Sequence, residues 1–556
     1  MQLRNIPGWG IAIALAAVAS AGDADRVRTY EIAIDFGSPV PSLGEGFNLL
    51  GGEYGPRINN HGRIAFSGAV DGPGVVSLPP NSQVVMTDSG NPDFEVIARN
   101  RDTAPPPLRP FPLEAITGQR MAFADSGDVH FRVSTTANPN LLLRWSPGDQ
   151  QSSVVLASDS PAPAFDGAEL TEIVTSWTNP AGSALVWARV VGPPESSVGG
   201  DVIYAETPSG ELIPRIKGFG PIPGVPDKIA TGLTAIANKA GSVAGVVRYG
   251  STGSGQVLLM EQADSSISPA LRTGQAAEWF HPSATVRSFG IGRQAMHAGS
   301  EDVGVVVGFA MPGDDDAGAV VAAVNRDGTA RIAATLGEAP AGFEPYEAFT
   351  SFFRSVINVS DSGDTVFTAD ISTETRSVQG LFRSSLDGTL ERIAQEGQIA
   401  PGLSGDLTFR DIDELSLQVN AAGQVVFGAT TSDQEEGIWA CDSDGSVLLL
   451  VRVGMTIDVD PSRAAEDLRT IQNFSPYFDL NDRGQFAMHV YFDDGTGGVL
   501  VAQIPAPPSA IMGLGSAALC LTRRKRERYS AARYLILVHH DDAAREYAYD
   551  RDSHIG

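Results

Sequence analysis

Histidine is the side chain best suited to acid–base chemistry and metal binding near neutral pH. The chain has eight histidines, at His61, His130, His281, His297, His489, His539, His540 and His554. No two of those before residue 505 have the close spacing of metal ligands, and we expect structural or solvated roles for His61 and His489. The sequence contains no Gly-x-Ser-x-Gly, P-loop or His-Glu-x-x-His motif. A catalytic triad assembled from distant residues stays open.

Three acidic segments contain residue types that can bind Ca²⁺ through carboxylate and carbonyl oxygens. They are "GDDDAG" (313–318), "CDSDGS" (441–446) and "FDDGTGG" (492–498). None has the complete Asp-x-Asp-x-Asp-Gly…Glu loop, and Asp-Gly is equally typical of a plain hairpin turn. We therefore assign no catalytic or cofactor-binding residue, and calcium is the one cofactor left open.

Tryptophan can also serve recognition, because an exposed indole stacks on a sugar ring. Five tryptophans lie in the part of the chain with predicted strands, at Trp145, Trp177, Trp187, Trp279 and Trp439. A tryptophan in a strand more often packs between sheets, and we expect that role here.

A repeated turn motif predicts the elements that position these side chains. Asn or a small residue is followed three places later by Gly, in eight copies spaced 55 to 65 residues apart. The first positions are Asn59, Ala124, Asn179, Asn238, Met296, Ser360, Asn420 and Asn481, and the glycines are Gly62, Gly127, Gly182, Gly241, Gly299, Gly363, Gly423 and Gly484. In such a turn an Asn side chain accepts a local hydrogen bond and Gly supplies positive φ. We expect the glycines to matter more to stability than the asparagines, whose hydrogen bonds should be local.

The segments after these turns are typical of strands that are covered on both faces. "RIAFSGAV" (63–70), "ALVWARVV" (184–191) and "QVVFGATT" (424–431) are apolar at successive positions instead of alternating with polar residues. A second motif, a strand followed by a polar or Gly turn and often a Pro-containing loop, interleaves with the first, as in "ERIAQEGQIAPG" (391–402).

The two ends of the repeat region are complementary. The region begins with the second motif, "YEIAIDFGSPVPS" (30–42), and ends with a turn motif and one more strand, "GGVLVAQIP" (497–505). We therefore predict an all-β domain at 26–505, an eight-bladed β-propeller closed by its N-terminal strand. An open β-solenoid is the alternative, and it would need capping repeats.

The turn motif resembles the tandem N-x-x-G-x-x-A-F repeat of exported bacterial proteins. Asn59, Gly62, Ala65 and Phe66 match all four marked positions. The resemblance covers about residues 28–504 and implies a secreted repeat protein without an established catalytic role.

Both chain ends resemble export signals. Arg4, an apolar run at 10–18 and Ala19-Ser20-Ala21 have the pattern of a signal peptide, 1–21, cleaved after Ala21. Residues 506–528 follow Pro505 and resemble a variant PEP-CTERM sorting signal, with an apolar stretch before a basic cluster. Its marked residues are Pro505, Pro507, Arg523, Arg524, Lys525 and Arg526. In that family the tail is removed by a membrane-bound processing enzyme, and the extension at 529–556 has no assigned role.

Composition narrows the classes of partner. The chain has 66 acidic and 39 basic residues and a formal net charge of -27, so a phosphate backbone would be repelled and nucleic-acid binding is excluded. The two cysteines, Cys441 and Cys520, lie in such different settings that we expect no disulfide between them.

Two function classes remain open from the sequence. The first is a noncatalytic exported protein of the cell surface or extracellular matrix, which binds polysaccharide or protein partners and contacts the membrane through its C-terminal segment before processing. The second is a propeller-type polysaccharide lyase or glycoside hydrolase, with an active site at one mouth of the central channel. Because propellers serve both classes, the fold alone does not decide between them.

Overall fold

Each described copy of the turn motif joins two consecutive antiparallel strands of one small sheet. The computed structural model describes residues 30–504, apart from 53, 76–81, 89–93, 107–110, 194–197, 239–240, 251–254, 292–301, 313, 341, 353–355 and 461–465. All of them belong to one compact unit of the chain. The fifth copy of the motif, at 296–299, lies outside the described residues.

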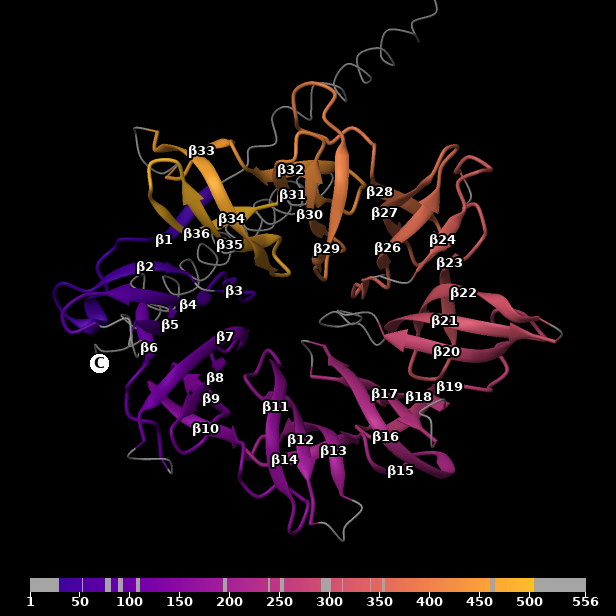
Figure 1. Ribbon diagram of the computed structural model, residues 1–556, viewed down its shortest axis with the longest axis horizontal. Helices are drawn as coiled ribbons and strands as arrows, with labels where there is room; N and C mark the ends of the chain where they lie inside the picture. Colours follow the sequence, from indigo (N-terminus) through magenta and orange to yellow (C-terminus); the bar gives the residue numbers. More distant parts are fainter. Residues whose placement is uncertain are drawn as a thin grey trace, which may run out of the picture. The chain divides into compact units, whose positions relative to one another are not determined.

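Eight sheets, which we call blades 1 to 8, follow one another around a ring (Figure 1). Blade 1 contains β2 (Asn48–Gly52), β3 (Arg57–Ile58), β4 (Ile64–Asp71), β5 (Gln83–Thr87) and β6 (Glu95–Arg99). Blade 2 contains β7 (Leu113–Phe123), β8 (Val129–Thr135), β9 (Leu141–Ser146) and β10 (Gln151–Ala157). Blade 3 contains β11 (Glu169–Thr178), β12 (Ala184–Val191), β13 (Gly199–Glu206) and β14 (Leu212–Lys217). Blade 4 contains β15 (Gly220–Ile222), β16 (Val225–Ala237), β17 (Val243–Tyr249), β18 (Gly255–Glu261) and β19 (Ile267–Arg272).

The second half of the ring repeats the same antiparallel plan. Blade 5 contains β20 (Thr285–Ile291), β21 (Val303–Met311), β22 (Asp314–Val324) and β23 (Ala330–Thr335). Blade 6 contains β24 (Phe349–Ser351), β25 (Ile357–Val359), β26 (Thr365–Ser372), β27 (Ser377–Ser384) and β28 (Leu390–Gln395). Blade 7 contains β29 (Phe409–Val419), β30 (Val425–Thr431), β31 (Glu436–Cys441) and β32 (Val447–Arg452). Blade 8 contains β33 (Thr456–Asp458), β34 (Leu468–Leu480), β35 (Gln485–Phe492) and β36 (Gly497–Gln503), and β1 (Tyr30–Asp35) completes it.

The N-terminal strand closes the ring. β1 pairs antiparallel with β36, from Tyr30 opposite Ala502 to Asp35 opposite Gly498. Blade 8 is therefore built from both ends of the repeat region, as the complementary half-repeats predict, and the prediction of an eight-bladed propeller is confirmed. The helical structure within the described residues is one short 3-10 helix, η1 (Pro41–Leu43).

The core is divided among the junctions between neighbouring blades. The described residues form eight apolar clusters, one at each of the eight junctions. In β30, for example, Val425 and Phe427 pack toward blade 6 while Val426 packs toward blade 8. Successive strand residues point to opposite faces of a sheet, so an apolar run is what a blade between two others requires.

The five described tryptophans and the described cysteine belong to this core. Trp145 and Trp439 are buried in two of the clusters, and Trp177, Trp187 and Trp279 are partly buried against others. Cys441 is a buried free thiol in β31, and Cys520 lies outside the described residues.

Candidate functional site

The antiparallel order of the strands separates two kinds of connection onto opposite faces of the ring. The asparagine turns and the next hairpin but one after each of them, such as β9–β10 and β31–β32, lie on one face, which we call the turn face. The hairpins directly after the asparagine-turn strand pair, such as β26–β27 and β30–β31, and the links between blades lie on the other, which we call the hairpin face. Figure 1 shows that β7, β11 and β29, the first strands of their sheets, lie toward the middle of the ring.

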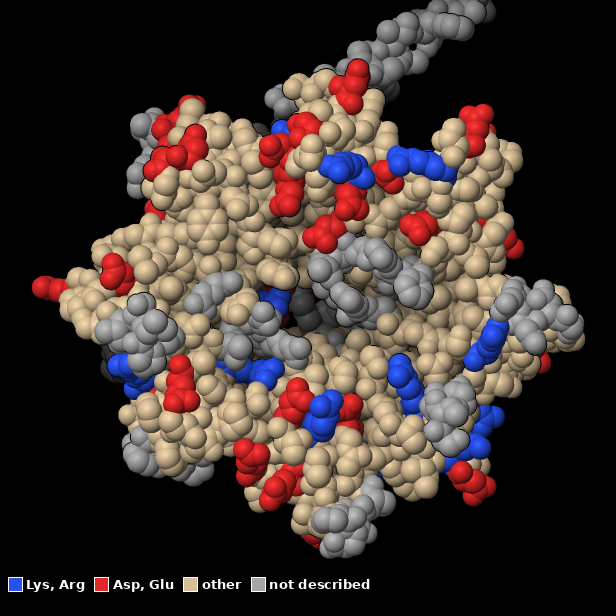
Figure 2. All heavy atoms as spheres, in the orientation of Figure 1, with Lys and Arg blue, Asp and Glu red and all other residues tan. Residues whose placement is uncertain are grey.

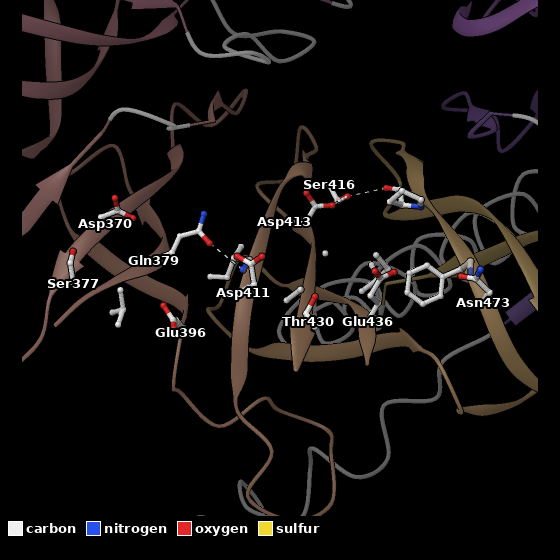
Figure 3. Close-up of a pocket in the computed structure, with 18 residues that line it drawn as sticks. Asp370, Ser377, Gln379, Glu396, Asp411, Asp413, Ser416, Thr430, Glu436 and Asn473 are labelled. Atoms are coloured by element: carbon white, nitrogen blue, oxygen red, sulfur yellow. Dashed lines mark hydrogen bonds between the residues drawn. The ribbon is translucent and has the colours of Figure 1, made fainter. Parts of the chain in front are cut away.

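A cavity of about 970 Å³ opens near the hairpin face and spans blades 6, 7 and 8. Its wall is formed by the ends of strands at the β26–β27 and β30–β31 hairpins and by the inner strands β29 and β34. Five of its described lining residues are acidic, namely Asp370, Glu396, Asp411, Asp413 and Glu436. None of the described lining residues is Lys, Arg, His or Tyr. The cavity therefore offers carboxylates together with amides and hydroxyls (Figure 3).

Hydrogen bonds between blades fix parts of this wall. The backbone N–H of Ile412 in blade 7 donates to Oε1 of Gln379 in blade 6, at 3.1 Å. The carboxylate of Glu396 pairs with Arg376, whose guanidinium lies 2.7 Å away and is 60 % exposed. Arg376 is exposed at the rim, where solvent screens its charge, so it does not neutralise the other carboxylates of the cavity.

Two bulges shape the inner side of the cavity. In β29 the pairing moves from Asp413 opposite Gly428 to Leu417 opposite Phe427, so residues 414–416 are extra. In β34 a similar irregularity lies between Phe474 and Phe478. The two bulges touch, since Oγ of Ser416 contacts both the carboxylate of Asp413 and the backbone oxygen of Pro476. Bulges redirect side chains, and here they bring polar groups of two blades to one wall.

Glycine at position 428 makes room for the bulge of β29. A Cβ atom on Gly428 would lie 2.9 Å from Cβ of Ser416, closer than real Cβ contacts allow. The sheet and the bulge can therefore approach each other only without a side chain at this position.

The charge of this region is visible on the molecular surface. Figure 2 shows acidic side chains gathered over the sheet of β29–β32, close to the middle of the ring. Low-dielectric walls lined by one sign of charge concentrate ions of the opposite sign.

The turn face carries the residues of the repeated motif. Seven turn glycines have φ between 75° and 93°, at Gly62, Gly127, Gly182, Gly241, Gly363, Gly423 and Gly484. The asparagines accept backbone hydrogen bonds within their own turns: Ser183 N–H donates to Asn179 and Ser242 N–H to Asn238, and Gln424 and Gln485 N–H donate to Asn420 and Asn481.

Three of the asparagines also bind the next blade, which corrects the expectation that their hydrogen bonds are local. Nδ2 of Asn420 donates to the backbone oxygen of Asn481, and Nδ2 of Asn481 donates to that of Asn59. Nδ2 of Asn59 in turn donates to the backbone oxygen of Ala124. The local motif hid this role because each acceptor comes from another copy of the repeat, in the neighbouring blade.

The second position of the turn forms a parallel chain of hydrogen bonds. The N–H of Ala421 donates to Oδ1 of Asp482, that of Asp482 to Oδ1 of Asn60, and that of Asn60 to Oδ1 of Asp125. The polar groups on this face are therefore used to join blades 7, 8, 1 and 2.

The acidic segments considered for calcium are hairpin turns where the structure describes them. Asp444 accepts a hydrogen bond from Ser446 N–H, and Asp494 accepts one from Thr496 N–H. The side chains at 314–317 and residue 313 lie outside the described set. Among the described residues, no group of three or more His, Cys, Asp and Glu side chains is placed to hold a metal ion.

The histidines divide into exposed and buried ones. His61 is exposed in its turn. His130 and His489 are buried, and burial lowers the pKa of each to about 4. Nε2 of His130 lies 3.1 Å from the backbone oxygen of Gly182 in the next blade, so His130 belongs to a junction rather than to an open site.

The model of a family of unknown function (DUF7453) matches residues 58–511. The chain belongs to this family. Within the described residues, the DUF7453 match begins at Ile58 in β3 and includes all the described asparagine turns and the cavity, whereas β1 and β2 precede it. No curated protein sequence matches the chain significantly.

The solved structures to which this DUF7453 chain is similar have low sequence identity to it. A Mycobacterium tuberculosis puromycin-hydrolysing peptidase has 13 % identity and a TM-score of 0.35, with 82 % of this chain and 61 % of that chain covered. Porphyromonas gingivalis dipeptidyl peptidase 4 has 9 % identity and a TM-score of 0.38, with 78 % and 57 % covered. A polysaccharide lyase, an ulvan lyase, has 10 % identity and a TM-score of 0.30, with 69 % and 92 % covered. The chain thus spans about three fifths of the length of the two peptidases.

Several predicted features lie outside the described residues. These are the signal peptide, the extension at 529–556 and the sorting signal with Pro505, Pro507, Arg523, Arg524, Lys525 and Arg526. No helix within the described part of the chain is long and apolar enough for a membrane span.

Sequence reasoning missed the carboxylates of the cavity, although one signal was present. Asp411 and Asp413 flank the buried Ile412 in β29. Residues two apart in a strand share a face, so the segment "RDIDE" placed two acids side by side. The contributions of blades 6 and 8 had no such signal, because they depend on the closed ring.

Proposed function

We propose that this protein is a noncatalytic exported binding module of the cell envelope or extracellular matrix, and that its partner carries cationic groups. The observation that carries the proposal is the cavity across blades 6 to 8, whose described lining includes five carboxylates and no Lys or Arg. A ligand amine entering it gains charge-assisted hydrogen bonds, which are stronger than those between neutral groups.

The remaining lining groups suit a polysaccharide with free amino groups. Gln379, Thr430 and Asn473 place amides and a hydroxyl beside the carboxylates. Sugar hydroxyls can form hydrogen bonds with the amides and the hydroxyl, while protonated amines bind the carboxylates. A chain-like ligand also suits a cavity that extends over three blades.

A binding experiment with the mature protein tests this proposal. Glucosamine oligomers should bind at pH 6, and their N-acetylated counterparts should bind at least tenfold more weakly because they lack the charge. Asp411→Asn combined with Glu436→Gln should weaken binding of the amine form by about tenfold or more. The matched control is Glu45→Gln with Glu211→Gln, which removes two exposed charges outside the cavity.

The outcomes separate the possible partners. Equal loss of binding in both double variants would mean that net charge, not the cavity, attracts the polymer. Binding of oligolysine without binding of glucosamine oligomers would replace the polysaccharide by a basic protein segment. Equal binding of the acetylated oligomers would contradict the role of the amines.

The location of the protein is part of the same proposal. The signal peptide and the variant sorting tail support export, followed by retention or processing at the cytoplasmic membrane. Intact-mass measurement on protein from the native host tests both the cleavage after Ala21 and the removal of the C-terminal tail. A species that retains Met1 and occurs only in the cytosol would remove the basis for an extracellular role.

Glycoside hydrolysis is a second candidate, supported by the pair Asp411 and Asp413 on one face of β29. The Cα atoms of residues two apart in a strand lie about 6.6 Å from each other, which allows their carboxyl groups the separation of about 6.5 to 9.5 Å found in inverting glycosidases. Incubation with a panel of exopolysaccharides would show new reducing ends if this candidate holds. Asp413→Asn should abolish their formation.

A further inference from the structure

Bulges interrupt the inner strands of blades 1 and 2 as well as β29 and β34. In blade 1 the bulge separates β2 from β3, which both pair with β4. In blade 2 it lies within β7, between Thr117 and Ala122. The two are joined, because Nε of Arg57 in β3 donates to the backbone oxygen of Met121 in the bulge of β7, at 3.0 Å. The described inner strands of blades 3 and 4 have only single-residue irregularities.

The bulge of blade 8 contacts the bulges on both sides of it. Oγ of Ser416 in blade 7 lies 3.0 Å from the backbone oxygen of Pro476 (Figure 3). A Cβ atom on Gly55, between β2 and β3, would lie 2.7 Å from Cβ of Tyr477, so the backbones of blades 1 and 8 meet directly. The bulges of blades 7, 8, 1 and 2 therefore form one continuous row, which we call the bulge row.

Tyr477 places an exposed aromatic side chain in this row. The residue is 57 % exposed, and it directly follows Pro476, which lines the acidic cavity. Its backbone is fixed in two ways, because its N–H donates to Oγ of Ser475 at 3.2 Å and its backbone oxygen and Cβ lie against Gly55. An aromatic ring is thus held on a rigid backbone at the edge of a cavity that contains carboxylates.

The combination of an aromatic ring with neighbouring polar groups suits a sugar. The C–H groups of a pyranose form an apolar face that packs on an aromatic ring, while its hydroxyls and amines extend from the rim of the sugar to polar side chains. Next to Tyr477 the cavity supplies such polar groups, with the amide of Asn473 on the same strand and the carboxylates of blade 7.

We propose that Tyr477 forms a stacking subsite for a second sugar ring of the polysaccharide whose amines bind in the cavity. This inference rests on the proposed function, since the carboxylates bind an amine of one residue and Tyr477 packs on the face of a neighbouring residue. The ligand chain then runs from the cavity along the bulge row toward blade 1. Stacking needs no charge, so Tyr477 contributes equally to binding of the amine and the N-acetylated polymer.

Titration of the full mature protein with hexamers of glucosamine and of N-acetylglucosamine at pH 6 tests this subsite. Ligand-observed NMR measures both affinities, including weak ones. Tyr477→Ala keeps the Cβ atom that faces Gly55, and it should weaken binding of both hexamers by about tenfold. Tyr477→Phe keeps the aromatic face and should bind both within about threefold of the intact protein.

Tyr346→Ala is the matched control. Tyr346 is 49 % exposed and is not among the residues that line the cavity, so its removal should leave both affinities unchanged. The thermal midpoint of Tyr477→Ala should equal that of the intact protein, because the contact of its backbone with blade 1 remains. An equal loss of affinity in Tyr346→Ala or in Tyr477→Phe would overturn the stacking subsite.

Comparison with the cavity variant separates this inference from the proposed function. Unchanged affinities in Tyr477→Ala, together with lost binding in Asp411→Asn with Glu436→Gln, would overturn the stacking subsite alone. The reverse pattern would support stacking on Tyr477 and contradict the role of the carboxylates. A loss confined to the amine hexamer would replace stacking by a cation–π contact with the amine. Absence of binding of both hexamers to the intact protein would overturn both proposals.

Discussion

Nδ2 of Asn481 donates a hydrogen bond to the backbone oxygen of Asn59, 2.9 Å away and 422 positions earlier in the chain. Both residues are buried, and both occupy the first position of the same turn motif in neighbouring blades. One amide therefore fixes a local turn through its oxygen and joins the last blade to the first through its nitrogen.

We expect Asn481→Ala to cost about 2 to 4 kcal/mol in the free energy of unfolding, because buried donors and acceptors on two blades lose their partner. Asn179→Ala is the control, since Oδ1 of Asn179 accepts only a bond within its own turn and about 1 kcal/mol should be lost. Chemical denaturation of both variants measures the difference. Equal costs would mean that the contact between blades adds nothing to the local turn.

The turn motif shows how much of this fold the sequence predicts. Glycine at positive φ and an asparagine that caps its own turn are local chemistry, so their spacing predicted the number of blades. The acceptor of Asn481 lies at the other end of the chain, and it is defined only after the ring closes. The same limit applies to the cavity, since the extra residues 414–416 shift the register of β29 without any turn residue to mark them.

Replacing Gly52 should damage the junction between blades 8 and 1 through packing alone. Gly52→Ala places a Cβ atom 2.1 Å from the imidazole of His489, and we expect a loss of about 1 to 3 kcal/mol from this overpacking. Gly51→Ala is a close control, because the nearest heavy atom would be Oη of Tyr491 at 3.8 Å. Thermal unfolding should show a lower midpoint for the first variant and a nearly unchanged one for the second. Similar shifts in the two would contradict the contact.

Arg383 should be far less replaceable than an exposed arginine. It is buried in β27, its Nη1 donates to the backbone oxygen of Asp442 in blade 7 at 2.9 Å, and its Nε donates to Glu391 at 3.0 Å. Arg383→Lys loses this fork and should cost about 2 to 4 kcal/mol. Arg376→Lys, in the exposed pair with Glu396, should cost less than about 1 kcal/mol. Urea titration of both variants measures the two losses.

Stability should fall in mild acid because of the two buried histidines. His130 and His489 have pKa values lowered to about 4, so the unfolded chain binds their protons first as the pH falls below 6.5. Their contribution is complete above pH 6.5 and is lost progressively down to about pH 4, by up to about 3 kcal/mol for each histidine. Urea unfolding at pH 7, 5.5 and 4.5 measures the slope, and His130→Leu with His489→Leu should flatten it. A slope unchanged in the double variant would assign the acid sensitivity to the carboxylates.

The N-terminal strand should be required for a stable monomer. β1 covers the outer edge of β36 through the pairing from Tyr30 to Asp35, and Oη of Tyr30 also donates to the backbone oxygen of Leu450 in blade 7. Without residues 22–35, β36 would present an open apolar edge, which favours pairing with another chain. We expect this deletion to give oligomers or aggregates in size-exclusion chromatography. A peptide with the sequence of residues 28–38 should restore the monomer by adding the missing strand, whereas a scrambled peptide of the same composition should not. A deletion variant that remains monomeric and as stable as the intact chain would show that side-chain contacts alone hold the ring closed.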